Sequence, residues 1–205
     1  MQAKSIKGKT PEEIQSALLQ AIADGFKPIL AIVFLSVSQD RKSITALFDK
    51  AAIRVFGVTS NGEFTDETPE KRSTVVLLLD LKPAYFRFYN AAYPNNNFKE
   101  ITYNIAGEAK KDFGNPAFLI AGSNSNTDAE ALLQGFIEAI GPQVDVFGCM
   151  AGDDFTFAEQ FVFTNNWESN KGLVVLALDA EKIIIKGKAT CGWKAVGTEK
   201  VVTKS

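Results

Sequence analysis

The sequence predicts a mixed α/β fold that is built twice along one chain. Two observations carry this prediction. The pair Phe56-Gly57 returns as Phe147-Gly148 at the end of a second strand-like run. Upstream, the stretch 28–40 returns as 116–128 at a constant spacing of 88 residues, beginning with proline and ending with aspartate both times. Each copy is expected to be a β-α-β unit followed by hairpin strands, with mixed sheets inside and helices on the outside.

A third match extends the repeat toward the C-terminus. The apolar run 75–80 returns as 174–179, now 99 residues later. Small insertions in loops explain the growing spacing, because loops tolerate them best. We therefore expect one domain over 1–205, made of two pseudo-repeats at about 28–90 and 116–188.

The expected elements of the first half follow in chain order. Thr10 precedes Pro11, Glu12 and Glu13, which is typical of a helix start: a capping hydroxyl, proline in the first turn, then acids near the positive helix end. A continuously apolar strand, a helix starting near residue 40 and three more strands follow, the last two paired across a Lys-Pro turn. These strands are expected at 29–35, 55–59, 75–81 and 85–89.

The second half repeats the scheme after a helix at 98–113. A strand, a helix and another strand come first, and a meander of short strands with polar turns closes the chain. The expected ranges are 117–122, 127–140 and 144–150, then 160–164, 173–178 and 183–188.

Composition excludes several classes of function. The net charge of -2 and the scattered basic residues give no surface for nucleic acid. No apolar run is long enough for a membrane span, and the N-terminus lacks a secretory signal, so we expect a cytoplasmic protein. Two cysteines make no disulfide framework or zinc site. Because the chain has no histidine, catalytic triads, zinc sites and haem ligation that use histidine are excluded. We expect no enzyme, no metal and no cofactor.

The two Phe-Gly loops are the first candidate for a binding site. Glycine permits close approach of a ligand, while carboxylates, hydroxyls and amides there suit a small polar molecule. The alternative is that these residues only shape turns at strand ends. The candidate ligand-binding residues are Thr59, Ser60, Asn61, Gly62, Glu63, Gly148, Cys149, Met150, Gly152, Asp153 and Asp154.

A second candidate is the strand-to-helix connection that contains Ser123 and Asn124. The free N–H groups and dipole of the following helix favour an anion such as a carboxylate. The alternative is an ordinary helix cap. An enzymatic alternative would need Cys149 as nucleophile, assisted by Glu63, Asp153 or Asp154.

The chain resembles the N-terminal FIST module. The resemblance rests on IRVFGVTSNGEF, GSNSNTDAEALLQGF, VDVFGCMAGDDF, GLVVLALDAEKIIIKG and GWKAVG, and it runs from about Ile29 to the end. It implies a cytoplasmic sensory or interaction domain. Bacterial members lie beside histidine kinases, chemotaxis transducers and cyclic-dinucleotide enzymes, and are suggested to bind small ligands such as amino acids. A eukaryotic relative is joined to an F-box and recruits proteins for ubiquitination.

Two departures from the family pattern bear on function. Family members usually continue into a C-terminal FIST half, which is absent here, so we expect either an excised piece or a stand-alone half. Some relatives sense nitric oxide through haem on a histidine, which this chain lacks.

The resemblance and the loops together predict a non-catalytic sensory domain. It would bind a small polar metabolite such as an amino acid and relay binding to a C-terminal FIST half or an output domain. The alternative is a protein–protein recruitment module without a small ligand. Neither nucleic acid nor membrane is an expected partner, and the isolated half is a candidate for homodimer formation.

Overall fold

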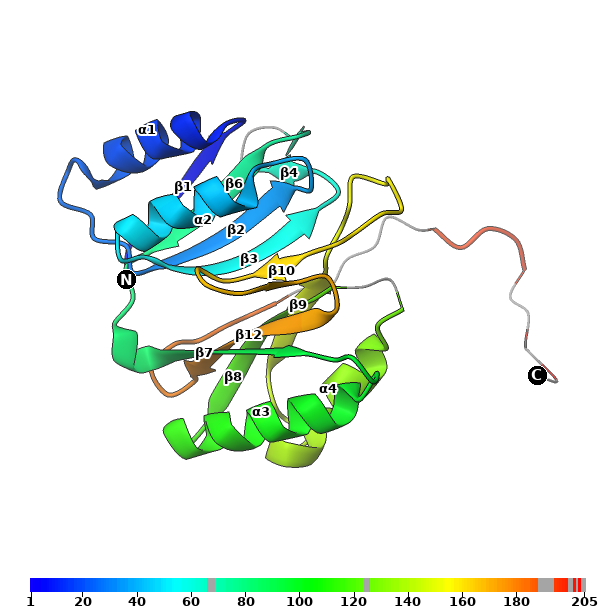
Figure 1. The fold of residues 1–205 in the computed structure, drawn as a ribbon. Helices are drawn as coiled ribbons and strands as arrows, with labels where there is room; N and C mark the ends of the chain where they lie inside the picture. Colours follow the sequence, from blue (N-terminus) through cyan, green and yellow to red (C-terminus); the bar gives the residue numbers. More distant parts are fainter. Residues whose placement is uncertain (66–68, 124–125, 188–193, 199–200, 202, 204–205) are drawn as a thin grey trace.

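The chain folds into four layers, helix, sheet, sheet and helix, in a computed structural model (Figure 1). The structure describes residues 1–65, 69–123, 126–187, 194–198, 201 and 203. Its two main sheets face each other in the middle, and the helices cover the two outer faces (Figure 1). The predicted mixed α/β class, with strands inside and helices outside, is confirmed.

The first sheet combines strands from both ends of the chain. Its order is β1-β6-β2-β3-β10-β11. Only β2 and β3 pair in parallel, as expected for a β-α-β unit, and every other neighbouring pair is antiparallel. Helices α1 (Pro11–Ile22) and α2 (Arg41–Lys50) cover its outer face. Its strands are β1 (Ala3–Gly8), β2 (Leu30–Ser36), β3 (Arg54–Ser60), β6 (Thr74–Leu79), β10 (Val162–Phe163) and β11 (Glu168–Ser169).

The second sheet has the order β7-β12-β8-β9, with β8 and β9 parallel. Helices α3 (Phe98–Asp112) and α4 (Ala129–Ile140) pack on its outer face. Two small elements, β4 (Glu63–Phe64) and β5 (Pro69–Glu70), pair outside the main sheets. The strands of the second sheet are β7 (Phe86–Ala92), β8 (Pro116–Gly122), β9 (Val146–Met150) and β12 (Gly172–Asp179).

The two sheets share one wiring. The first half has four main strands, which lie in the order β1-β6-β2-β3, that is first, last, second, third. The four main strands of the second half lie in the corresponding order, β7-β12-β8-β9. In each half the matching elements start before the repeat predicted from the sequence, at 28–90 or 116–188. They include β1 with α1 in the first half and β7 with α3 in the second. Residue 188 lies outside the described residues.

Two predicted strand assignments were wrong. The strand near 85–89 does not pair with its predecessor, because Pro83 begins a short 3₁₀ turn (Pro83–Tyr85) that leads the chain into the second sheet, where β7 pairs with β12. Of the predicted strand 183–188, the described residues 183–187 form no strand.

The helix starts follow the sequence signals. The Thr10 hydroxyl accepts a hydrogen bond from the N–H of Glu13 at 3.3 Å, and Pro11 opens α1. Asp40 and Asp128, matched in the repeat, cap α2 and α4 in the same way.

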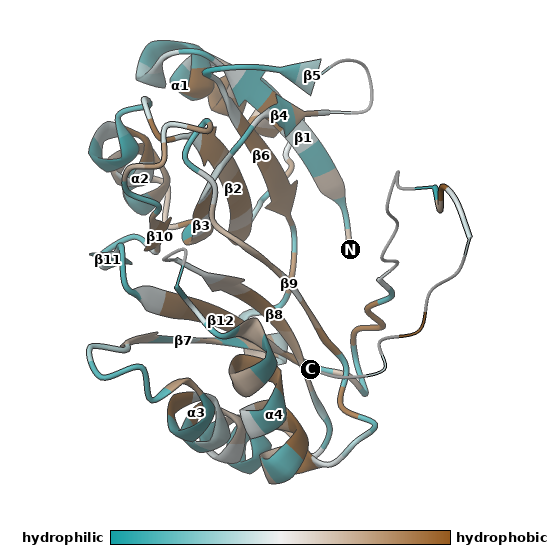
Figure 2. Ribbon diagram, turned by 90° about the vertical axis from the view of Figure 1, so that its right-hand side faces the viewer, coloured by the Kyte–Doolittle hydropathy of each residue, from teal (hydrophilic) through white to brown (hydrophobic). Residues whose placement is uncertain are grey.

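A core between the two sheets joins the halves. It is built from the inward faces of both sheets, which alternate with the faces that pack on helices. Figure 2 shows the strongly apolar strands gathered between the two helix layers. The buried residues of this core are Leu30, Phe56, Val58, Leu81, Phe86, Ala121, Ala151, Val162, Val174, Leu176 and Leu178.

Candidate functional site

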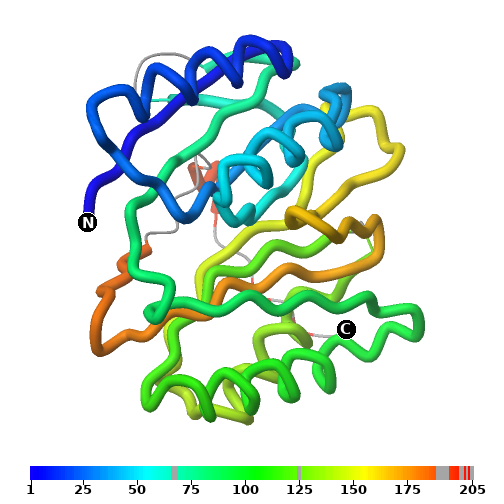
Figure 3. Tube along the Cα trace, turned by 60° about the vertical axis from the view of Figure 1, so that its left-hand side comes forward, coloured from blue at the N-terminus to red at the C-terminus, as the bar shows by residue number. Residues whose placement is uncertain are grey.

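The loops that follow β3 and β9 meet directly. After β9 the chain leaves the second sheet and crosses to the first, beside α2 (the yellow segment in Figure 3). There the N–H of Gly152 donates to the carbonyl of Thr59 at 2.7 Å, and the Thr59 hydroxyl donates to the carbonyl of Gly152 at 2.6 Å. A Cβ at Gly152 would lie 2.6 Å from Oδ1 of Asn61, so only glycine permits this approach.

Asn61 fixes the start of the second loop. Its Oδ1 accepts hydrogen bonds from the N–H of Asp153 at 2.7 Å and of Phe155 at 3.4 Å. A side chain of the first half thus takes the place of a backbone partner for the second half. The geometry of the two loops is therefore coupled through one amide.

Two of the predicted acids are used inside the loops. Glu63 is buried and accepts hydrogen bonds from the Ser60 hydroxyl at 2.6 Å and from the Ser73 hydroxyl at 2.9 Å. Asp153 is also buried, and its carboxylate accepts from the N–H of Ala158 at 2.9 Å. These carboxylates stabilise the loops, because buried acceptors need such partners.

A cavity of about 530 Å³ opens where β2 and β3 end. Ligands of α/β sheets commonly bind beyond the carboxyl ends of parallel strands, and β2 and β3 are such a pair. Asp154 borders the cavity and accepts a hydrogen bond from the Ser36 hydroxyl. The lining residues are Val37, Ser38, Asn61, Lys71, Arg72, Asp154, Phe155 and Thr156.

The cavity wall carries both signs of charge. Lys71 and Arg72 are exposed and, in the described part of the chain, form no ion pair at 4 Å or less, while Asp154 supplies a carboxylate. Three wall residues also hold the left-handed backbone that side chains disfavour, with φ of 54° at Arg72, 57° at Asp154 and 61° at Phe155. Such strain gathers at functional loops in many proteins.

The other predicted site residues lie elsewhere. Ser123 is buried and its Oγ both donates to the Gly172 carbonyl at 3.1 Å and accepts from the Gly172 N–H at 2.9 Å. Its carbonyl accepts from the Tyr93 hydroxyl. It thus tethers the end of β8 to β12. Asn124 lies outside the described residues.

Gly148, Cys149 and Met150 form part of β9 and line a different cavity, next to α4. Crowding by protein atoms raises the pKa of the Cys149 thiol, although part of the residue reaches the surface. A raised thiol pKa leaves less thiolate at neutral pH, which is the opposite of an activated nucleophile. The arrangement gives the enzymatic alternative no support.

Comparison with protein families identifies the chain. The model of the FIST N domain matches residues 29–205. The chain belongs to the FIST family. FIST domains are sensory modules of signal transduction, and the family is not known as one of enzymes. Comparison with curated proteins gave no match.

Two features were sought among the described residues of this FIST domain. None of its described helices is long and apolar enough to cross a membrane. Within the same residues, no group of three or more acids and cysteines is arranged to hold a metal ion.

Sequence reasoning missed six of the eight residues of the FIST cavity wall, all except Asn61 and Asp154. Ser38 is not among the predicted site residues, and neither are Lys71 and Arg72. The adjacent positive charges of Lys71 and Arg72, close to the matched run at 75–80, were a usable signal. Phe155 and Thr156 follow Asp154 directly, so extending that loop by two residues would have included them.

Proposed function

We propose that this FIST domain senses a small polar ligand, of the class of free amino acids, in the cavity at the ends of β2 and β3. One observation carries the proposal: loops from both halves meet there through Asn61, around a cavity with both signs of charge. A ligand carboxylate would be attracted to Lys71 and Arg72, and its ammonium group to Asp154.

The same contacts suggest how binding is relayed. Asn61 belongs to the first half, whereas Asp154 and Phe155 belong to the loop that leads into β10. A ligand held by both would stabilise one relative arrangement of these loops, and only such differential binding shifts a conformational equilibrium. The receiver in this proposal is a C-terminal FIST half or a signalling output domain.

A thermal-shift panel tests the proposal. The panel contains the common amino acids, with matched amines and carboxylates that carry only one of the two charges. At free ligand of about 100 times Kd, binding adds about 2.7 kcal/mol, or about 5–10 °C for a chain of this size. We expect a shift with a zwitterion and little with either single-charge relative.

Two variants assign a shift to this cavity. Arg72→Gln and Asp154→Asn should each weaken the shift, because each removes one charge from the wall. Lys50→Gln, at the far end of α2, is the matched control and should leave the shift unchanged. No shift across the panel, or equal shifts in all three variants, would argue against the proposal.

A recruitment module is the second candidate, and exposed aromatic side chains favour it. Phe64 of β4 is 74% exposed, and Phe155 and Phe157, on the loop after β9, are 70% and 91% exposed. Exposed aromatics of this kind mark protein contacts. If recruitment is the function, Phe157→Ser should abolish partner capture while leaving any ligand-induced thermal shift intact.

A further inference from the structure

The edge of β3 is sealed by a strand from the other half. β10 pairs antiparallel with β3, with Phe163 directly opposite Gly57. The ring of Phe163 lies over this glycine: a Cβ at Gly57 would be 2.1 Å from Cε2 of the ring. The ring is buried in the core between the sheet and α2. The edge of β3 is thus covered by β10, whose Phe163 ring packs between Gly57 and α2.

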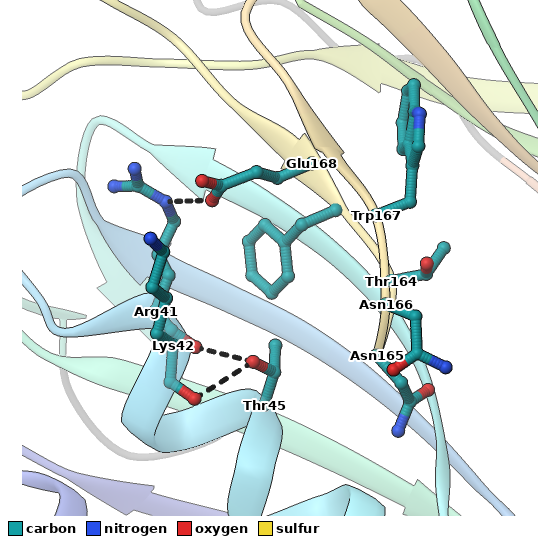
Figure 4. A pocket seen from close by; sticks show the side chains of 9 residues that line it. Arg41, Lys42, Thr45, Thr164, Asn165, Asn166, Trp167 and Glu168 are labelled. Atoms are coloured by element: carbon teal, nitrogen blue, oxygen red, sulfur yellow. Dashed lines mark hydrogen bonds and ion pairs between the residues drawn. The ribbon is translucent and has the colours of Figure 1, made fainter.

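The hairpin β10–β11 is also anchored by polar contacts. Nε of Arg41, on α2, lies 3.4 Å from Oε2 of Glu168, an ion pair visible in Figure 4. The Arg41 guanidinium lies 3.8 Å from the centre of the Phe161 ring. Asn165 accepts from the N–H of Val55 at 2.8 Å. The charge of Arg41 on the helix and the aromatic ring just before β10 therefore act together.

The counterpart of β3 in the second half is β9, and no described strand pairs with its outer edge. β9 pairs with β8 on one side and with no described strand on the other. Gly148 takes the place of Gly57 and lies on the side of the sheet that faces α4. The atoms nearest its Cβ position are not those of an aromatic ring: all three belong to Ile120 of β8, at 2.2–3.0 Å.

The space beside Gly148 is a cavity of about 380 Å³. Leu132 and Leu133 of α4, Ile120 of β8 and Met150 of β9 form its walls. It lies between α4 and β9, as the Phe163 ring lies between α2 and β3. We call this cavity the β9 socket. Its mostly apolar lining suits an apolar side chain.

We propose that the β9 edge binds an extended segment of a partner protein, which pairs antiparallel with β9 and inserts an aromatic side chain into the β9 socket. The molecule itself shows the fitting occupant, since β10 makes this contact on β3. The charge of α4 adds a preference: Glu138 is paired with Lys99, but Glu130 forms no ion pair within the described residues, and the helix has no lysine or arginine. A basic residue beside the aromatic therefore suits the partner segment.

A second copy of β9 fits the socket less well. Residues directly opposite in an antiparallel pair lie on the same face of the sheet. On the face toward α4, a second β9 would present Val146, Gly148 and Met150, none of them aromatic. Its Phe147 alternates to the opposite face. A separate, aromatic-bearing strand is thus the better occupant.

The probe is a synthetic peptide with the sequence of residues 160–165, QFVFTN, and one lysine added at each end. Its control has alanine in place of the second phenylalanine. Binding to the full chain is followed by fluorescence polarisation of a labelled peptide. We expect saturable binding, at least about tenfold weaker for the alanine peptide, and weakening with salt because of the acidic helix.

Leu133→Lys tests the place of binding. Leu133 is 40% exposed, so the change places a charge at the socket without emptying the core. We expect peptide affinity to fall by at least about tenfold. Leu19→Lys, an equally conservative test of an exposed leucine on α1, should change nothing.

Three results would overturn the proposal: no peptide binding, binding indifferent to Leu133→Lys, or a concentration-dependent dimer of the full chain that this variant abolishes. The last would assign the edge to a second copy. Neither variant touches the wall of the ligand cavity, so both should retain any amino-acid shift. Failure here is therefore distinguishable from failure of the proposed sensing function.

Discussion

Replacing Gly57 with alanine tests the contact that joins the two halves at the β3 edge. The new methyl carbon would lie 2.1–2.4 Å from three ring atoms of Phe163, far inside contact distance. The ring is 1% exposed and borders a cavity beside Arg41 and Thr45 of α2. Overpacking of this kind costs about 1–3 kcal/mol, and the three-atom overlap places Gly57→Ala at the upper end.

A double-mutant cycle isolates the contact from other effects. Phe163→Ala alone should cost about 3–5 kcal/mol, because it empties a buried ring site. In that background the alanine at residue 57 enters vacated space and its cost should vanish. The expected coupling between the two positions is therefore about 1–3 kcal/mol in favour of the double variant.

Urea unfolding followed by circular dichroism measures the three variants against the parent chain. The losses should appear in the unfolding midpoint with the slope unchanged, since the surface exposed on unfolding stays the same. Additive losses, within about 0.5 kcal/mol, would refute the direct contact and with it the analogy on which the β9 socket rests.

Three further outcomes follow from the packing and burial of single residues. Gly107→Ala in α3 has open space at its Cβ position and should stabilise the chain by about 1 kcal/mol in urea unfolding. Gly135→Ala in α4 should instead destabilise it, because the new Cβ would lie 2.0 Å from a hydroxyl of α3. Burial raises the pKa of Tyr93, so the stability that its neutral form contributes is complete below about pH 10 and is lost as pH rises through the folded pKa. Tyr93→Phe should therefore lower the free energy of unfolding by about 1 kcal/mol at neutral pH and reduce the loss of stability at alkaline pH. Parallel curves of stability against pH for the two proteins would contradict this. In a Cys191→Ser background, Cys149 should react with iodoacetamide more slowly at pH 7 than glutathione does, and a faster reaction would indicate an activated thiol.

Local signals in the sequence predicted most of the elements, and they failed where pairing is long-range. The caps at Thr10, Asp40 and Asp128 predicted three helix starts. β1 was missed because Ile6 is its sole large apolar residue, while its lysines suit an edge strand. The partner of β7 was misassigned, since a Lys-Pro turn between two strands resembles a hairpin, and no local pattern specifies pairing with a strand some 85 residues later.

The same distinction between local signals and long-range contacts applies to the predicted site residues. Asn61, Gly152 and Asp153 were expected to converge because the repeat placed both loops at strand ends, and the structure brings them together. Ser123 and Cys149 looked equally polar or reactive in the sequence. Their burial and their hydrogen-bond partners, which depend on the whole fold, place them away from that cavity.

The crossing of β10 into the first sheet also sets an order for folding during synthesis. When the first half leaves the ribosome, the strand that will seal β3 has not yet been made, because Phe163 lies about a hundred residues after Gly57. Until then the nascent chain displays an apolar, unpaired strand edge, which is a target for aggregation and for chaperones. The first sheet is thus completed only after most of the second has been translated, and neither half reaches its final form alone.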